Sequence, residues 1–241
     1  MTTASAALLM IAASPDSSAC TGISLKAQDG SRIVARTVEW AATPMQCGYA
    51  VVPRGHVQQS YTPSGENGLK YKAVYGYVGI YTEYEPFVVE GVNEAGLSAG
   101  LFFFPGYGDY KAYNSARNNV TLCDMQFVSW VLSQFSTIDQ MKDALDDLDL
   151  VTLDHRIGAV HWRITEPGGR MVVLEVVGGV PQFYENKLFT FPSVNDRVSK
   201  VTLMPVDGIF DRGKTRTNKA EALIPTNIYM LTGLPTTWKK L

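Results

Sequence analysis

The stretch CTGISLKAQDGSRIVARTVEW, residues 20–40, decides the fold. Two runs rich in β-branched residues, 21–25 and 33–38, flank the sequence QDGS. An Asp-Gly pair between two such runs is a strong hairpin signal, because glycine adopts the turn conformations that join antiparallel strands. The stretch therefore predicts a β-hairpin that begins directly after Cys20.

Two more hairpins are predicted further along the chain. Residues 87–92 and 97–104 flank the sequence NEAG, and residues 159–165 and 171–177 flank EPGG. Each pair has strand-like composition on both sides of a turn rich in glycine, proline or asparagine. We expect both pairs to be antiparallel.

Helical material lies between the second and third hairpins. Apolar residues recur there at roughly helical spacing: Leu122, Phe127, Trp130 and Val131. A second helix is expected from Ser136 through Leu148, with Asp139 and Asp143 suited to its N-terminal half. The periodic signal weakens after about Lys187. Strand pairs, then helices, then strand pairs predict a layered α+β architecture with antiparallel sheets.

Composition excludes several classes of function. The hydrophobic fraction is 46% and the charged fraction 18%, which is typical of a chain with a sizeable core. A formal net charge of −2 gives no electrostatic reason to expect nucleic acid as a partner. No apolar run reaches the roughly 18 residues of a membrane-spanning helix, so no membrane insertion is expected. The three cysteines are widely spaced and no metal-ligand pair stands out, so we expect no disulfide framework, no metal and no other cofactor.

Residues 1–19 differ from the rest of the chain. The apolar run AALLMIAA is followed by SPDSSA, with small residues at Ser17 and Ala19 as signal peptidase accepts. This pattern predicts a signal or pro-segment, a periplasmic or secreted bacterial protein, and a single domain over residues 20–241. No Lys or Arg precedes the run, which leaves the translation start open. A frayed arm is the alternative; a lipoprotein would need leucine where Ser17 stands.

Cleavage after Ala19 would give Cys20 its own base. A thiol with its usual pKa of about 8.5 is a poor nucleophile at neutral pH, whereas a free α-amino group has a pKa of about 7.7 and accepts protons there. Nucleophile and base then share one residue. Arg36 and Glu39 lie on the second strand of the hairpin, which can fold either residue close to Cys20.

Four motifs in this order resemble the choloylglycine hydrolase family of bile salt hydrolases and penicillin V acylases. They are CTG at residues 20–22, RTVEW at 36–40, EGVNEAGL at 90–97 and LFFFPGY at 101–107. The resemblance covers roughly residues 20–187. It implies a four-layer αββα sandwich of the N-terminal-nucleophile (Ntn) hydrolases, and hydrolysis of a linear amide through an acyl-enzyme.

The resemblance also implies roles for individual residues. Cys20 would be the nucleophile and, through its amine, the general base. Arg36 would lie beside the thiol, and Glu39, where the family usually has aspartate, would orient the amine. Phe102 is the candidate for the backbone oxyanion donor, with Phe103 one register away.

Other positions complete or depart from the family pattern. Trp40 and Phe103 are expected at the substrate pocket, although such aromatic residues are more often core. Phe191 stands where the family has the asparagine of the oxyanion hole, and Arg216 is the candidate for the family's late arginine. The chain is also shorter than family members, with late strands that have no visible counterpart.

Two function classes follow from this comparison. One is an amidase acting on conjugated bile salts, penicillin V or N-acyl homoserine lactones. Cys20, Arg36 and Glu39 favour this function. The other, which Phe191 favours, is an inactive or very slow relative that binds such amphipathic acyl compounds. In either case the expected partner is a small acyl amide; homo-oligomerisation is left open.

Structural interpretations compete with these roles. Cys20 could be a core cysteine, and Arg36 and Glu39 could form an ordinary ion pair. Cys47 and Cys123 are expected to be inert apolar side chains. A Cys–His dyad would have to use one of the three histidines: His56, His155 or His161. His161 alternates inside a strand pattern next to Trp162, which favours a structural role.

Overall fold

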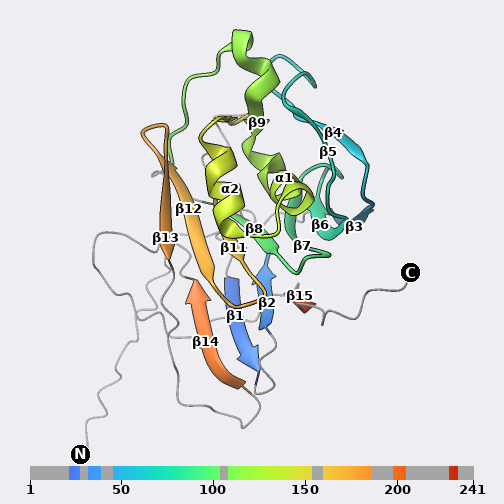
Figure 1. Cartoon of the computed structure of the whole chain (residues 1–241), viewed down its shortest axis with the longest axis vertical. Helices are drawn as coiled ribbons and strands as arrows, with labels where there is room; N and C mark the ends of the chain where they lie inside the picture. The colour runs from blue at the N-terminus through green and yellow to red at the C-terminus, as the bar shows by residue number, and fades with distance from the viewer. Residues whose placement is uncertain are drawn as a thin grey trace, which may run out of the picture.

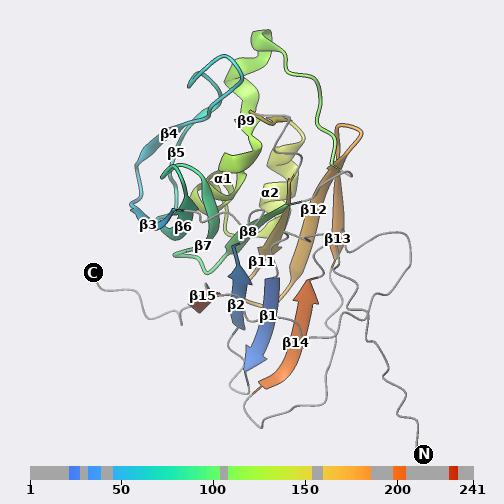
Figure 2. The same ribbon diagram turned by 180° about the vertical axis from the view of Figure 1, so that it is seen from behind.

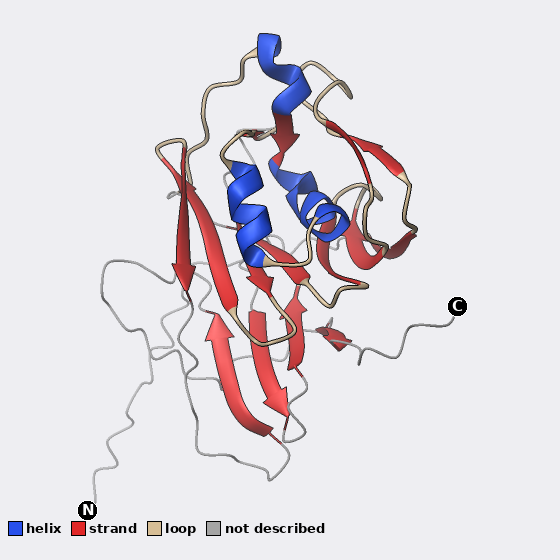
Figure 3. Cartoon of the chain, in the orientation of Figure 1, coloured by secondary structure: helices blue, strands red, loops and turns tan. Residues whose placement is uncertain are grey.

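The computed structural model describes residues 22–27, 32–38, 46–103, 108–153, 160–185, 198–204 and 228–232, and strands make up most of its regular structure (Figures 1 and 3). Its larger sheet has seven antiparallel strands in the order β13-β12-β11-β8-β7-β6-β3. These strands are β3 (Cys47–Val52), β6 (Tyr77–Thr82), β7 (Val88–Asn93), β8 (Ser98–Phe103), β11 (Val160–Thr165), β12 (Met171–Val177) and β13 (Val180–Glu185).

A second antiparallel sheet contains the hairpin that follows Cys20. Its four strands have the order β14-β1-β2-β15. They are β1 (Gly22–Ala27), β2 (Arg32–Thr37), β14 (Val198–Met204) and β15 (Ile228–Thr232). The central pair β1–β2 is local in sequence, whereas both outer strands come from the last fifth of the chain.

The remaining elements are short. They are β4 (Val57–Gln59), β5 (Lys70–Lys72), β9 (Thr121–Cys123), β10 (Asp149–Val151), the 3₁₀ helices η1 (Ser115–Val120) and η2 (Asp124–Gln126), and the α-helices α1 (Phe127–Gln134) and α2 (Ile138–Leu145). Thr137 caps α2 by accepting a hydrogen bond from the backbone N–H of Gln140. None of the described helices combines the length and apolarity that crossing a membrane requires.

The two faces of the large sheet meet different layers. Trp162 and Ile164 on β11 belong to the core that α1 and α2 complete, and the rings of Trp162 and Phe127 lie 4.6 Å apart. Alternation along the strands turns the intervening residues the other way. There Phe102 approaches Gly22 of the smaller sheet. Figures 1 and 2 show β1, β2 and β14 together, away from the two helices. The described residues thus form three layers, α, β and β, of an α+β sandwich.

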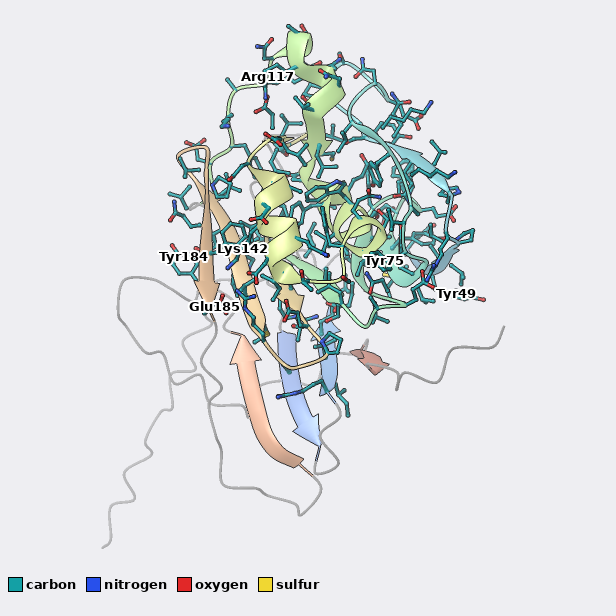
Figure 4. All side chains as sticks on the ribbon, in the orientation of Figure 1. Tyr49, Tyr75, Arg117, Lys142, Tyr184 and Glu185 are labelled. Carbon is teal, nitrogen blue, oxygen red and sulfur yellow. The ribbon has the colours of Figure 1, made fainter. Side chains whose placement is uncertain are left out.

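The edges of the large sheet are polar or exposed. At one edge, Tyr49 on β3 is 75% exposed. At the other, Glu185 on β13 pairs with Lys142 of α2 at 3.3 Å. Figure 4 shows these labelled side chains on opposite sides of the molecule.

Most local predictions are confirmed and two are corrected. All three predicted hairpins exist, as β1–β2, β7–β8 and β11–β12. Leu122 is not helical: it lies in β9, where it pairs in parallel with Leu150 of β10. The second helix spans Ile138–Leu145 rather than Ser136–Leu148, because Thr137 caps its start and the chain enters β10 at Asp149. Strands β14 and β15 fall where the sequence predicts no regular element.

Candidate active site

The structure describes three of the residues that the sequence assigns to the site: Arg36, Phe102 and Phe103. The others lie outside the described residues: Cys20, Glu39, Trp40, Phe191 and Arg216. Gly22, at the start of β1, is the described residue nearest to Cys20 in the chain. The contacts of Gly22 therefore show what surrounds the chain two residues after Cys20.

Arg36 reaches from β2 into the large sheet and is 2% exposed. Its Nη1 donates to the carbonyl of Val89 on β7 at 2.8 Å, and also to the carbonyl of Leu101 on β8. The pairing of β7 with β8 ends one step earlier, at Glu90 and Gly100. Val89 and Leu101 would form the next pair, so the guanidinium bonds to carbonyls at the point where the strands separate. The cation is fixed there by backbone geometry.

The register of β8 also orients the candidate oxyanion donors. The N–H of Asn93 donates to the carbonyl of Leu97 at 3.0 Å, which directs the odd-numbered residues of β8 toward β7. Phe102 is even-numbered and pairs with His161, so its N–H is directed toward β11. The N–H of Phe103 is directed toward the β7 side, where the strands separate. Register thus favours Phe103 over Phe102 as the backbone donor.

The ring of Phe102 is the centre of a cluster that also contains Arg36, Arg163 and Gly22. The guanidinium carbon of Arg36 lies 4.5 Å from the ring centroid and that of Arg163 lies 5.6 Å from it. A Cβ on Gly22 would lie 2.7 Å from the ring. A side chain where β1 begins would force either the Phe102 ring or β1 to shift, which favours glycine at this close approach. The Cys20 end of the hairpin is held against a ring that two cations flank.

A buried ion pair lies beside this ring. Arg163 on β11 pairs through Nη2 with Oε1 of Glu90 on β7, and their side chains are 0% and 1% exposed. Burial raises the pKa of the Glu90 carboxyl and lowers that of the Arg163 guanidinium, and their mutual attraction opposes both shifts. The two side chains meet over Gly100 of β8, where a Cβ would collide with Glu90. Sequence analysis missed this pair; glycine inside an otherwise apolar strand was its one local signal.

A second buried pair follows on the same face. Nδ1 of His161 lies 3.4 Å from Oε1 of Glu175 on β12, and the imidazole meets the ring of Phe102 edge-on with centroids 6.0 Å apart. His161 is thus the histidine that the structure brings to the candidate site. His56 directly precedes β4, and His155 lies outside the described residues.

The two described cysteines differ from what a nucleophile requires. Burial raises the pKa of the Cys123 thiol well above its usual value, which keeps it protonated. Cys47 is half-buried in the edge strand β3. Neither lies beside a guanidinium of the cluster. Within the described ranges no three His, Cys, Asp or Glu side chains are grouped so that they could hold a metal ion.

Residues 20–191 match the family described as "Linear amide C-N hydrolases, choloylglycine hydrolase family". A bile salt hydrolase/transferase of Clostridium perfringens is 26% identical over 174 residues, covering 70% of this chain and 51% of the relative. One from Lactiplantibacillus plantarum is 29% identical over 118 residues, covering 46% of this chain and 36% of the relative.

Solved structures show the same fold. A variant conjugated bile acid hydrolase from Clostridium perfringens matches with a TM-score of 0.58 at 22% identity, over 73% of this chain and 54% of that one. A penicillin V acylase from Agrobacterium tumefaciens matches with a TM-score of 0.58 at 22% identity, over 69% and 49%. The chain spans about half the length of the relatives it matches.

Proposed function

The chain belongs to the choloylglycine hydrolase family of linear amide C–N hydrolases, and on that premise we propose that it hydrolyses a small acylated amide with Cys20 as N-terminal nucleophile. The proposed substrate is a conjugated bile salt, penicillin V or an N-acyl homoserine lactone. Maturation by cleavage after Ala19, in the periplasm or outside the cell, is part of the proposal.

The reaction needs one acid–base group and one nucleophile. The α-amino group of Cys20 takes the thiol proton, and the thiolate attacks the amide carbonyl carbon to give a tetrahedral oxyanion. The amine then gives its proton to the departing nitrogen as the C–N bond breaks, which leaves a thioester on Cys20. Water, deprotonated by the same amine, attacks the thioester; the C–S bond breaks, the acid is released and the ammonium returns its proton to the departing thiolate.

The observation that carries the proposal is the packing of Gly22. Two residues after Cys20, the chain is pressed against the ring of Phe102, on which the buried cation of Arg36 also lies. A buried cation near a thiol favours the thiolate, because separating the charges again would cost electrostatic energy. The backbone N–H of Phe103, or of Phe102 one register away, would stabilise the oxyanion.

The test compares two forms of the protein. The form that begins at Cys20 should hydrolyse at least one of a phenoxyacyl, a bile-salt and an acyl-homoserine-lactone amide. The form that retains residues 1–19 should be inert, because its Cys20 nitrogen is a peptide N–H. Cys20→Ala should abolish hydrolysis while Cys47→Ala, the matched control, should not. Equal turnover by the cleaved and uncleaved forms would refute the proposal.

A second candidate function rests on Phe191. Phenylalanine cannot donate a hydrogen bond where the family has an asparagine amide, and loss of one such donor costs about 10²–10³ in turnover. We accordingly consider a very slow or inactive relative that binds amphipathic acyl compounds. Wild-type protein would then bind a bile salt without releasing product, and Phe191→Asn would gain turnover. Rapid turnover by the wild type would exclude this candidate.

A further inference from the structure

Arg163 and Glu90 form a charged unit that the proposed mechanism does not use. Both side chains are fully buried, on strands that flank β8. Burying an ion pair is costly, and well-packed apolar residues of similar volume are often equally stable. Stability alone is thus a weak reason for this pair to lie here.

The cationic side of the pair is aimed at the start of β1. Arg163 uses Nη2 for Glu90, while its buried Nε and Nη1 find no hydrogen-bond partner in the described part of the chain. Nη1 lies 3.4 Å from the position of a Cβ on Gly22. The Glu90 carboxylate lies over Gly100 on the same face of the sheet, where it meets Nη2 of Arg163.

Chain length limits how far Cys20 can be from this cation. An extended chain advances at most about 3.6 Å per residue, so two residues place Cys20 within about 7 Å of Gly22 in any conformation. That limit allows a separation of up to roughly 15 Å between the thiol and the guanidinium, and over about 8–15 Å a unit charge with an effective dielectric constant near 20 still shifts a pKa by about one unit. Arg163 is therefore close enough to act on the thiol without touching it.

Resting on the proposed function, we propose that Glu90–Arg163 is a positioning pair that sets the thiolate population of Cys20, with Arg163 favouring the thiolate and Glu90 restraining that effect. Arg36, tied to two carbonyls, contributes a fixed cation from β2. Among the described residues, the other charged or titratable groups on this face of the large sheet are Cys47 and Tyr49 on β3, His161 on β11, Glu175 on β12 and Tyr184 on β13. The pair thus adjusts a field that Arg36 establishes.

The experiment uses the protein that begins at Cys20, in a Cys47→Ala background, and measures the rate of Cys20 alkylation by iodoacetamide against pH. Arg163→Met should raise the apparent pKa of alkylation by about one unit. Glu90→Gln should lower it, because the cation then acts unopposed. The double variant Glu90→Gln/Arg163→Met removes both charges and should return the apparent pKa to near the wild-type value.

Opposite signs separate this role from a purely structural one. If both single variants shift the apparent pKa in the same direction, or neither shifts it, the inference is wrong. Where Arg163→Met does not fold, Arg163→Lys keeps the charge and must keep the wild-type pKa, and the double variant, without a buried charge, tests folding. The proposed function fails separately: it is refuted if no amide is turned over, whatever the alkylation profiles show.

Discussion

Gly100 is the residue that lets two distant side chains meet. Glu90 and Arg163 are 73 positions apart in sequence, and no spacing rule could have paired them. What the sequence does show is a glycine in the middle of the strand SAGLFF, which indicates a close approach. The place of Arg36 on the second hairpin strand, by contrast, is predictable, because that strand pairs with one only a few residues away.

Gly100→Ala should therefore lower the free energy of unfolding of the protein. A Cβ at this position collides with the Glu90 carboxylate and crowds Arg163 Nη2, at 3.1 Å, so the buried ion pair must shift. Breaking such a pair costs roughly 3–5 kcal/mol of unfolding free energy. Gly168→Ala is the matched control, because nothing lies within 4 Å of its Cβ position. Equal midpoints of urea unfolding for the two variants would contradict this reading.

Asp124 should make stability depend on pH. Burial raises the pKa of its carboxyl to about 6, although the N–H of Met125 donates to it. The folded state then holds the proton more tightly than the unfolded state does. Stability from this group is therefore present near pH 4, falls as the pH rises, and is lost above about pH 6. The full effect is roughly 3 kcal/mol.

Asp124→Asn removes this titration and should therefore abolish the loss of stability that accompanies a rise in pH. The difference in unfolding free energy between variant and wild type should grow in the variant's favour from pH 4 to pH 7. Asp146→Asn, on an exposed carboxylate, controls for the change in net charge. A constant difference over this pH range would show that Asp124 does not titrate as described.

At the scale of elements, the β7–β8 hairpin is joined to α1 through Asn93, which is 5% exposed. Its Nδ2 donates to the carbonyls of Leu132 at 2.9 Å and Phe135 at 2.7 Å, at the C-terminus of the helix. Its Oδ1 accepts from the N–H groups of Ala95 and Leu97 inside the turn. One amide therefore satisfies a hairpin turn and a helix end that would otherwise be unpaired. This gives the NEAG sequence a structural reason.

Asn93→Asp should destabilise the protein by roughly 2–4 kcal/mol at pH 8, because a carboxylate would face two carbonyl oxygens. The loss should shrink toward pH 5, where a raised carboxyl pKa lets the protonated acid donate one of the two bonds. Asn119→Asp, at an exposed position, is the control. Thermal unfolding at both pH values measures the effect; a pH-independent loss would contradict this explanation.

Elements were predictable where their partners are neighbours in sequence. The three hairpins carry their turn signals between their own strands. Strands β14 and β15 pair with β1 and β2 from more than 160 positions away, so their state depends on edges that local composition cannot reveal. The prediction that Leu122 is helical was wrong for a related reason: its parallel partner Leu150, rather than its spacing from Phe127, determines its conformation.

At the scale of the whole molecule, the sandwich places charge where an apolar core is the norm. One face of the large sheet packs against helices through side chains such as Trp162, while the opposite face buries the Glu90–Arg163 ion pair and the polar pair His161–Glu175 around Phe102. The sequence predicted the layered α+β architecture from the order of its elements. It could not predict the charged layer, because that layer forms only when four strands are assembled.

The proposed function requires Cys20, as the first residue of the processed chain, to form a thioester with the acyl group of its substrate. Mass spectrometry tests it most directly: the Cys20-start protein is mixed with a phenoxyacyl amide such as penicillin V, quenched with acid within the first turnover, and digested. We expect one acyl adduct, on the peptide that begins at Cys20, which decays as product appears and is absent from Cys20→Ala. An adduct on Cys47 or Cys123 alone, or product formation by Cys20→Ala, would contradict it.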